Sequence, residues 1–468
     1  QVSYCDVTNL KHTDVTEPKK GLEDTDGSNY FDDVKSKYAV TGARYAGGYI
    51  GYMNIGSAAS VGKGLSILGT AIGINNVLDA LNVVVSTIEH SNVTGNVGGF
   101  AVKASWKNTA SDASANDILG DAGGFAGKIS GGHIQDSNAN NFSYIIGQIT
   151  AGGYVGDLQP GNVANVLGDA SILDGLVNVK ESLASVAEDF VPTIRNSSTT
   201  CIPCGGAVRA DADSTTQVQR GMAGGYAGHN EGGHIWGNNT KKWKGKAYTE
   251  PTSICKAVRI RSVYGKEIAG GFTGLMESAD TASTGNLSLL WGLVKVDNIL
   301  GALSIVYPTE ENTAVYGPLA QMDYKNWNDW VKFVGKKGGY GSDLAEHGTV
   351  NSQAELDEII GKYAYGYNVV AGRENYRDEI KLANGGAAGG YVGSMQTGTI
   401  TNGQAYQAKT IKGIRCAGGF AGEMINGGAA KLGGVDILGL NLQLGQMLQV
   451  LNIFVPVIKQ SSVEGYQS

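Results

Sequence analysis

Apolar and polar residues alternate in seven short segments, each beginning with the hexapeptide Ala-Gly-Gly-aromatic-x-Gly. The seven copies begin at Ala46, Ala122, Ala151, Ala223, Ala269, Ala388 and Ala417. Counting this Ala as position zero, position three is always Tyr or Phe, position five is always Gly, position seven is apolar in six copies and position six is polar in five. This period of two predicts a strand that buries the aromatic, Gly and apolar positions and turns position six outward. If the copies are equivalent, their rings stack in register, about 4.8 Å apart.

The spacing of the copies indicates the length of one repeat. Ala122 and Ala151 are 29 residues apart, and so are Ala388 and Ala417. Such a unit is too short for a domain and fits one coil of a repeat fold, in which neighbouring units share a continuous core. We therefore expect a mainly β fold, a right-handed parallel β-helix (β-solenoid), with residues 1–468 forming one continuous repeat array.

Four apolar stretches interrupt the repeats with helical spacing, at about 61–91, 163–195, 284–307 and 431–459. The last is long enough to suggest a membrane span, but it contains Asp436 and several Asn and Gln residues. We predict amphipathic helical insertions that cover a flank of the repeats.

Composition narrows the class of protein. The chain has 36 Lys and Arg against 43 Asp and Glu, a formal charge of −7, so it offers no basic field for nucleic acid or an anionic membrane. It has 71 Gly but only 8 Pro and no Gly-X-Y period, which excludes collagen and argues against a disordered linker. We expect no nucleic-acid partner and no membrane insertion.

The stretch AGGYVGSMQTGTITNGQAYQAKTIKG, residues 388–413, resembles the GLUG-type repeat, in which a G-G-apolar-apolar-G strand precedes a G-x-I-x-N strand. Aromatic residues stand where that family has its name-giving Leu. Such repeats occur in large bacterial surface and secreted proteins, including adhesins and non-catalytic parts of immunoglobulin-cleaving proteases. The resemblance implies an extracellular, cell-surface repeat region and no particular activity. We expect a monomeric fragment of a longer chain.

Few residues suggest catalysis or metal binding. HNEGGH, from His229 to His234, lacks the helical H-E-x-x-H spacing of a zinc protease, and DTDGSN at 24–29 fits a plain turn better than a calcium loop. CIPC at 201–204 is compatible with a local disulfide or with two free thiols. We predict no catalytic residues, no metal and no cofactor.

Binding residues are expected where the repeat is interrupted. The spacing after Ala223 is 46 residues, and an aromatic-rich insertion spans about 318–385. The candidate ligand-binding residues are Trp236, Trp243, Tyr248, Tyr324, Trp327, Trp330 and Tyr340. Exposed Trp and Tyr bind sugar faces and protein surfaces well because they bury large areas at low entropic cost. The alternative is that Trp327 and Trp330 form the core of a small helical subdomain.

These observations favour a non-catalytic fragment of a bacterial surface protein that binds a host glycoprotein, immunoglobulin or glycan. Two alternatives stay open. A β-helix polysaccharide lyase or hydrolase would use clustered carboxylates that no fixed spacing reveals. A structural stalk spacer would bind no ligand.

Overall fold

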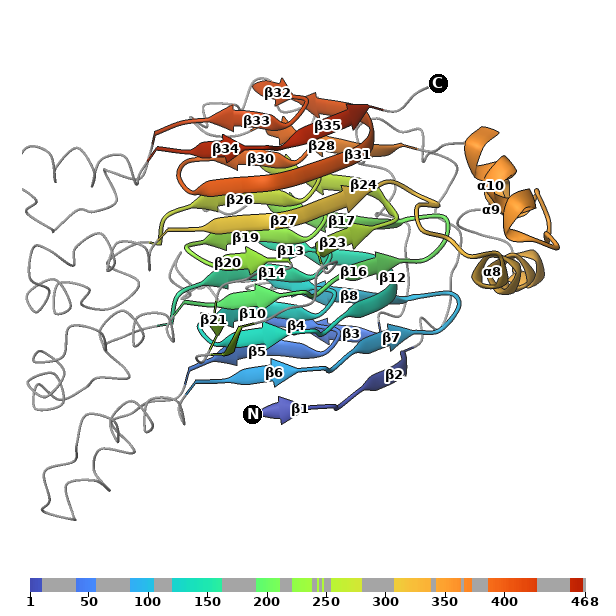
Figure 1. Ribbon diagram of the computed structural model, residues 1–468, viewed down its shortest axis with the longest axis horizontal. Helices are drawn as coiled ribbons and strands as arrows, with labels where there is room; N and C mark the ends of the chain where they lie inside the picture. Colours follow the sequence, from blue (N-terminus) through green and yellow to red (C-terminus); the bar gives the residue numbers. More distant parts are fainter. Residues whose placement is uncertain are drawn as a thin grey trace, which may run out of the picture.

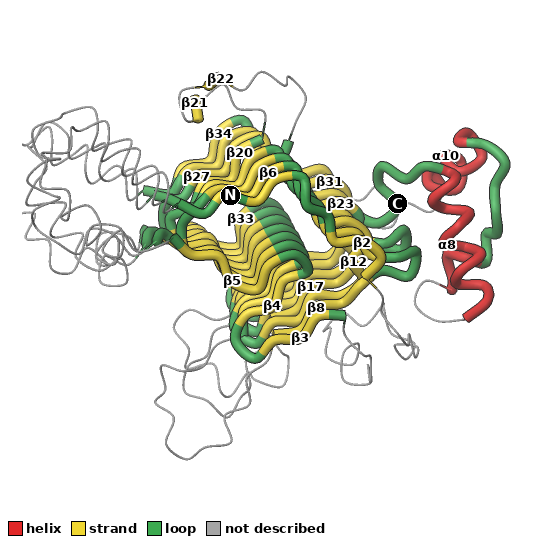
Figure 2. Tube along the Cα trace, turned by 90° about the horizontal axis from the view of Figure 1, so that it is seen from below, coloured by secondary structure: helices red, strands yellow, loops and turns green. Residues whose placement is uncertain are grey.

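The computed structural model describes residues 1–10, 39–55, 85–104, 120–161, 191–210, 221–237, 242–243, 246–247, 254–279, 307–337, 342–362, 366–372, 386–426 and 455–465. Within these ranges, parallel strands from successive repeats are stacked on one another, and a group of helices lies at one side of the stack (Figure 1). Viewed along the stack, equivalent strands lie one behind another (Figure 2).

Two open parallel sheets contain the hexapeptides. Sheet B contains β4(Tyr45–Gly47), β9(Asp121–Gly123), β13(Thr150–Gly152), β18(Met222–Gly224), β25(Ile268–Gly270), β29(Ala387–Gly389) and β32(Cys416–Gly418). Sheet C contains β5(Ile50–Asn54), β10(Ala126–Ser130), β14(Val155–Gln159), β19(Ala227–Glu231), β26(Thr273–Glu277), β30(Val392–Met395) and β33(Ala421–Met424). Each hexapeptide therefore supplies one strand to each sheet and the short connection between them.

Glycine is required where these two strands approach each other. A Cβ on Gly123 would lie 1.9 Å from the carbonyl oxygen of Ala126, and a Cβ on Gly393 would lie 2.6 Å from that of Ala269. Contacts this short exclude any side chain. Gly393 is buried, as predicted for position five, and it faces the backbone of the preceding unit.

The predicted ring ladder is confirmed. Neighbouring rings stack with centroid distances of 4.7 to 5.1 Å along the series Tyr49, Phe125, Tyr154, Tyr226, Phe272, Tyr391 and Phe420. The five inner rings are fully buried, whereas Tyr49 and Phe420 at the two ends are partly buried. The strand spacing of about 4.8 Å fixes the ring spacing, so each added unit extends the same apolar column.

Sheet A is the largest sheet and has 19 strands in the described part of the chain. Its first ten strands are β1(Val2–Ser3), β2(Val7–Leu10), β3(Val40–Gly42), β6(Thr87–Glu89), β7(Val93–Gly95), β8(Phe100–Ala104), β11(His133–Gln135), β12(Ala139–Gly147), β15(Thr193–Arg195) and β16(Thr199–Cys201). The others are β17(Gly206–Ala210), β20(His234–Trp236), β23(Cys255–Val258), β24(Ile260–Gly265), β27(Thr309–Tyr316), β28(Tyr367–Ala371), β31(Thr399–Gly413), β34(Val457–Lys459) and β35(Ser462–Gly465).

The pairing of sheet A corrects the predicted fold class. The long strands β12, β27 and β31 each pair with successive strands of a neighbouring unit, so that β12, β16, β23, β27, β31, β28, β24 and β17 close a ring of eight parallel strands. The prediction of a right-handed parallel β-helix (β-solenoid) is therefore wrong. The described chain is mainly β, with a closed eight-stranded parallel sheet that carries extra strands and with two open parallel sheets.

The four ranges predicted as helical insertions lie largely outside the described residues. The last residues of three of them are strands: Thr87–Glu89, Thr193–Arg195 and Val457–Lys459. The described helices are α8(Tyr324–Lys337), α9(Ser342–Ala345) and α10(Gln353–Lys362), all within the predicted insertion at 318–385. A two-stranded antiparallel pair, β21(Lys242–Trp243) and β22(Lys246–Ala247), lies in the other interruption.

Candidate functional site

The helices α8–α10 form a small module between β27 and β28. Trp327 and Trp330 form its core and are 0% and 1% exposed, with ring centroids 5.5 Å apart. The indole N–H of Trp327 donates to the carbonyl oxygen of Gly348 at 2.9 Å. These two candidate residues therefore present no ring to solvent. Their burial agrees with the alternative that they form the core of a small helical subdomain.

Side chains fix how the module begins. Asp323 caps α8, because its Oδ1 accepts hydrogen bonds from the backbone N–H groups of Lys325 and Asn326. Ser352 caps α10 by accepting from the N–H of Glu355, whose carboxylate in turn accepts from the N–H of Asn351. Backbone N–H groups at the N-termini of α8 and α10 thus have side-chain acceptors, which fixes where each helix begins.

The buried face of the module packs on sheet A. Its core is continuous with Tyr144, Ile202 and Ala207, on units that precede β27 in the chain. The packing is close, since a Cβ on Gly98 would lie 2.4 Å from Cζ of Phe333. The module therefore folds back along the flank of the stack, where Figure 1 shows it projecting to one side.

Polar contacts reinforce this docking at residues 319–322. Nζ of Lys256 donates to Oε1 of Gln321 at 2.7 Å, and the N–H of Leu319 donates to the carbonyl oxygen of Pro203 at 3.4 Å. The guanidinium of Arg259 contacts Sδ of Met322 at 3.8 Å. Burial lowers the pKa of Arg259 to about 10. The module is consequently held at a fixed position against the stack.

The opposite face of the module is exposed and polar. Lys325, Asp329 and Lys332 are exposed on α8, and Glu355 and Asp357 are exposed on α10. Exposed cations thus lie on α8, and exposed carboxylates lie on both α8 and α10, so a partner with complementary charges could be recognised here.

The remaining candidate residues have different placements. Tyr324 is partly buried at the start of α8. Trp236 is 8% exposed, lies against the Arg195 guanidinium at 4.9 Å and stacks with His234 at 4.4 Å, and its Nε1 donates to Thr309. The side chains of Trp243, Tyr248 and Tyr340 lie outside the described residues. Of the described candidates, Tyr324, Trp327 and Trp330 belong to one apolar cluster in the module, and Trp236 lies outside that cluster on β20.

A cluster of charged side chains lies where position six was expected to face outward. Lys128, Asp157 and His229 occupy this position on β10, β14 and β19, and the parallel register aligns them. Nζ of Lys128 is 2.7 Å from Asp157 Oδ2, and His229 Nδ1 is 2.9 Å from Asp157 Oδ1. His229 Nε2 is 3.1 Å from Glu277 Oε1. Asp157 and His229 are buried, so the expectation that they face solvent is wrong.

The pKa values in this cluster follow from burial and pairing. Burial would lower the pKa of His229, but the bonds to Asp157 and Glu277 outweigh it and raise that pKa to about 10. For Asp157, Lys128 and His229 outweigh burial and hold the pKa below its usual range. Burial raises the pKa of Asp121 to about 7, with the Asp157 charge adding to it and Lys128 opposing it. Two neighbouring carboxyl groups thus have pKa values displaced in opposite directions.

A second polar cluster lies inside the core and replaces apolar residues of the ladders. Glu310 of β27 stands between Ile235 and Ile400 in its column, where the other units carry Ile or, at Val2, Val. Its Oε1 accepts from Thr273 Oγ1 at 2.6 Å and from Asn230 Nδ2 at 3.3 Å. These polar residues come from three separate columns, yet they meet at one place.

Tyr391 completes this cluster from the ring ladder. Its hydroxyl is 2.9 Å from Glu310 Oε2 and 2.5 Å from Thr313 Oγ1. Glu310 is fully buried, and burial raises its pKa, opposed by the bonds from Thr273, Tyr391 and Asn230. The carboxyl group therefore serves as an acceptor for three donors within an otherwise apolar core.

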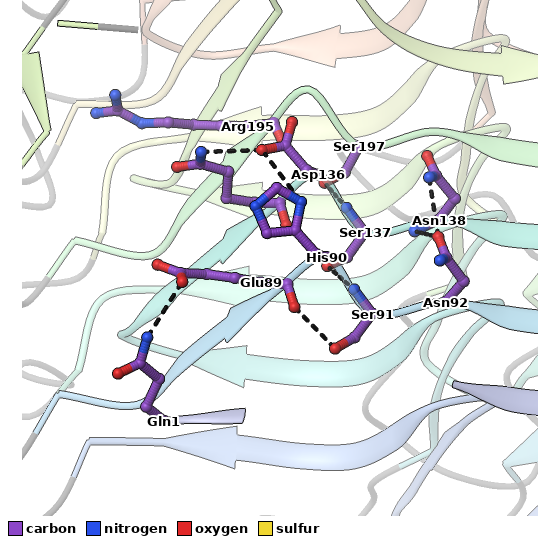
Figure 3. A network of polar contacts seen from close by, with 11 residues as sticks. Gln1, Glu89, His90, Ser91, Asn92, Asp136, Ser137, Asn138, Arg195 and Ser197 are labelled. Atoms are coloured by element: carbon purple, nitrogen blue, oxygen red, sulfur yellow. Dashed lines mark hydrogen bonds and ion pairs between the residues drawn. The ribbon is translucent and has the colours of Figure 1, made fainter. Parts of the chain in front are cut away.

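Serine and asparagine ladders line one corner of sheet A (Figure 3). The hydroxyl oxygen of Ser137 accepts from the N–H of Ser91, and that of Ser197 accepts from the N–H of Ser137, each at 3.1 Å. Asn92 Oδ1 accepts from Asn138 Nδ2 at 3.0 Å. These contacts satisfy backbone groups at the corner, which is a structural role.

Polar residues at particular repeat positions already indicated these clusters in the sequence. The column at position six already contained Lys128, Asp157 and His229, and Asn230 was the exception at position seven. Asp121, Glu277, Thr273 and Glu310 were missed because they occupy other columns, which only the folded chain brings next to those residues. The recurring Ser-Asn and Ser-Ser pairs after the Ile strands mark the corner ladders.

Other features bear on function within the described part of the chain. It contains no group of three or more His, Cys, Asp or Glu side chains arranged to hold a metal ion. None of its helices has the length and apolar character to cross a membrane. Cys201 and Cys204 are both buried, and burial raises the pKa of Cys201 well above its usual value.

Comparison with known proteins adds no relative: no protein-family model, no curated protein and no solved structure matches the chain.

Proposed function

We propose that this chain is a non-catalytic, macromolecule-binding part of a bacterial surface protein, and that the exposed face of α8 and α10 contacts the ligand. The observation that carries this proposal is the two-sided character of the module. One side is anchored to sheet A through Trp330 and Phe333, while Lys325, Lys332 and Glu355 face solvent on the other. Function concentrates on inserted segments that a rigid scaffold positions.

The chemistry of this face favours a protein ligand, such as a host glycoprotein or an immunoglobulin. Sugar faces bind flat aromatic rings, and the two indoles of the module, Trp327 and Trp330, are buried. Exposed Lys, Asp and Glu side chains on adjacent helices instead match a partner with complementary charges. The resemblance to GLUG-type repeats supports a location at the bacterial cell surface.

The test is a binding array of serum proteins, immunoglobulins and glycans, followed by charge reversal on the hit. Lys325→Glu with Lys332→Glu should weaken binding about tenfold or more if both lie in the interface. Lys459→Glu, an exposed charge on β34 away from the module, is the matched control and should bind normally. If the unmodified chain, the double variant and the Lys459 variant bind equally, the ligand contacts another surface. If the array gives no hit, the stalk spacer is favoured instead.

A polysaccharide-cleaving enzyme is the second candidate, favoured by the Asp121 and Asp157 carboxyl groups. Environments that push the pKa values of two neighbouring acids apart are typical of acid–base pairs in catalysis. New reducing ends or unsaturated products after incubation with a polysaccharide panel, lost in Asp121→Asn, would support this activity. Intact substrates across the panel would count against it.

A further inference from the structure

Lys128 and Asp157 are placed as the two reactants of an amide bond. They lie opposite each other on the neighbouring parallel strands β10 and β14, in consecutive units of the stack. Nζ of Lys128 is 2.7 Å from Oδ2 of Asp157, and the two side chains are 12% and 8% exposed. An amine and a carboxyl group held in contact react as if at very high concentration, because the entropy of association is already lost in the folded chain.

The surroundings of this pair are poor in water. In the preceding unit, the ring of Tyr45 lies under Nζ of Lys128, 5.9 Å from ring centroid to Nζ. In the following units, the columns of Asp121 and Asp157 continue with buried apolar residues, Met222 and Leu275. The loss of hydration raises the free energy of the ion pair relative to that of a neutral amide.

His229 is placed to stabilise the charge that develops during such a reaction. Its Nδ1 is 2.9 Å from Oδ1 of Asp157, the oxygen that does not contact Lys128. Although burial lowers the pKa of His229, its bonds to Asp157 and Glu277 raise it to about 10, so both ring nitrogens carry protons near neutral pH. Nδ1 therefore donates to Oδ1 and would continue to donate to the oxyanion that forms there as Cγ becomes tetrahedral.

Asp121 supplies a carboxyl group that can exchange protons near neutral pH. It is buried beside the pair, and its Oδ1 accepts a hydrogen bond from Thr150 Oγ1 at 2.8 Å. Burial raises its pKa to about 7, with the charge of Asp157 adding to the shift and that of Lys128 opposing it. A group with a pKa near the ambient pH can both take up and release a proton. Asp121 is therefore placed to relay the protons that amide formation moves.

From this arrangement we propose that Lys128 and Asp157 form an intramolecular amide crosslink between consecutive units of the stack. A bond forms between Nζ of Lys128 and Cγ of Asp157, and the bond from Cγ to Oδ2 breaks. The two protons that the ammonium group loses leave with Oδ2 as water, so no other reactant is needed. Asp121 relays these protons and returns to its initial state, while His229 keeps its bonds to Oδ1 and to Glu277. The crosslink consumes the Asp157 carboxylate and is therefore an alternative to the polysaccharide-cleaving activity.

Intact mass spectrometry of the purified full chain tests this crosslink. The folded chain should be lighter than its sequence mass by one water molecule, and the deficit should persist in denaturant, because an amide bond does not dissociate. Trypsin should no longer cleave after Lys128, since the acylated side chain carries no charge. Chymotryptic cleavage after Tyr144, which lies between Lys128 and Asp157 in the chain, should then leave both in one branched peptide.

Three variants assign the loss of water. Lys128→Arg keeps a cation next to Asp157, but its guanidinium stays protonated and is no nucleophile, so this variant should have its full sequence mass. Asp121→Asn keeps the size of the side chain but cannot exchange protons, so the deficit should appear about a hundredfold more slowly after folding. Lys332→Arg, at an exposed position on α8, is the matched control and should show the full deficit. Circular dichroism checks that each variant is folded.

Three results would overturn the proposal or part of it. A full chain with its complete sequence mass contains no crosslink, and Lys128 and Asp157 then form an ion pair only. A mass deficit that Lys128→Arg retains comes from another residue. A deficit that appears at the same rate in Asp121→Asn would exclude Asp121 from the reaction.

Discussion

Glu310 offers a quantitative test of how the buried polar cluster contributes to stability. In Glu310→Ile, the core column becomes apolar, as it is at Ile235 and Ile400. The substitution removes the acceptor of Thr273 Oγ1 and of Asn230 Nδ2, both fully buried. A buried donor without its partner costs roughly 1–3 kcal/mol. Two such donors give a loss of about 2–6 kcal/mol, reduced by the gain from burying an apolar side chain.

Glu310→Gln is the matched control. Its amide oxygen can accept from Thr273 and Asn230, and its amide N–H can donate to the Tyr391 hydroxyl, which can donate to Thr313. The free energy of unfolding should therefore change by about 1 kcal/mol or less, since no polar group loses its partner. In the Glu310→Ile background, Thr273→Val should raise stability, because it removes a hydroxyl that has lost its acceptor.

The direction in which stability changes with pH gives an independent test of the Glu310 environment. Burial raises the pKa of Glu310 in the folded state above the value of an unfolded Glu. Its contribution is therefore fully present below the unfolded pKa and is lost as pH rises through the folded pKa. Denaturant unfolding of the three proteins between pH 4 and pH 8 should show a stability loss with rising pH that Glu310→Gln lacks. A Glu310→Ile protein as stable as the unmodified chain, or an equal loss of stability in both variants, would contradict this role of Glu310.

Three further predictions concern the repeats and the module. The folded pKa of His229, about 10, lies above the unfolded value of 6.5, so its contribution to stability is complete below pH 6.5 and is lost as pH rises through 10. Melting temperatures from pH 7 to pH 10 should fall less in His229→Gln, and parallel curves would contradict this. Gly393→Val should cost at least 1–3 kcal/mol, because its Cβ would meet backbone, and an unchanged melting temperature would refute the contact. Trp327→Ala should lower the stability of the module by about 3–5 kcal/mol, which proteolysis would detect as faster cleavage between β27 and β28. Gly361→Ala is the control and should be cleaved at the normal rate, because a Cβ there meets nothing within 4 Å.

The stacked hexapeptide strands were predictable because the pattern that specifies them lies within a few consecutive residues. The aromatic at position three and the period of two predicted parallel strands with stacked rings, and the structure confirms both. Ring closure in sheet A was not predictable, because it depends on Ala139–Gly147 and Thr399–Gly413 each running as one long strand across a corner. Polar residues lie inside both segments, at Asn140–Asn141 and Thr401–Gln404, but they do not show whether the strand bends or breaks there.

The candidate site was less predictable than the fold. Aromatic residues in an insertion are expected both in binding faces and in small cores, and only packing distinguishes the two. Trp330 belongs to the same buried apolar cluster as Tyr144 and Ile202, which precede it by more than a hundred residues, so no local pattern could place it. The pairing of His229 with Asp157 and Glu277 likewise depends on register between units rather than on sequence neighbours.

The most direct test of the proposed function is the binding of a chain in which residues 319–365 are replaced by a short Gly-rich turn. Shortening a connection costs little loop entropy, so the parallel stack should remain folded, with an unchanged strand signal in circular dichroism. This protein should lose binding to the array ligand, while the unmodified chain retains it. Full binding by the shortened protein would contradict the assignment of the binding face to α8 and α10.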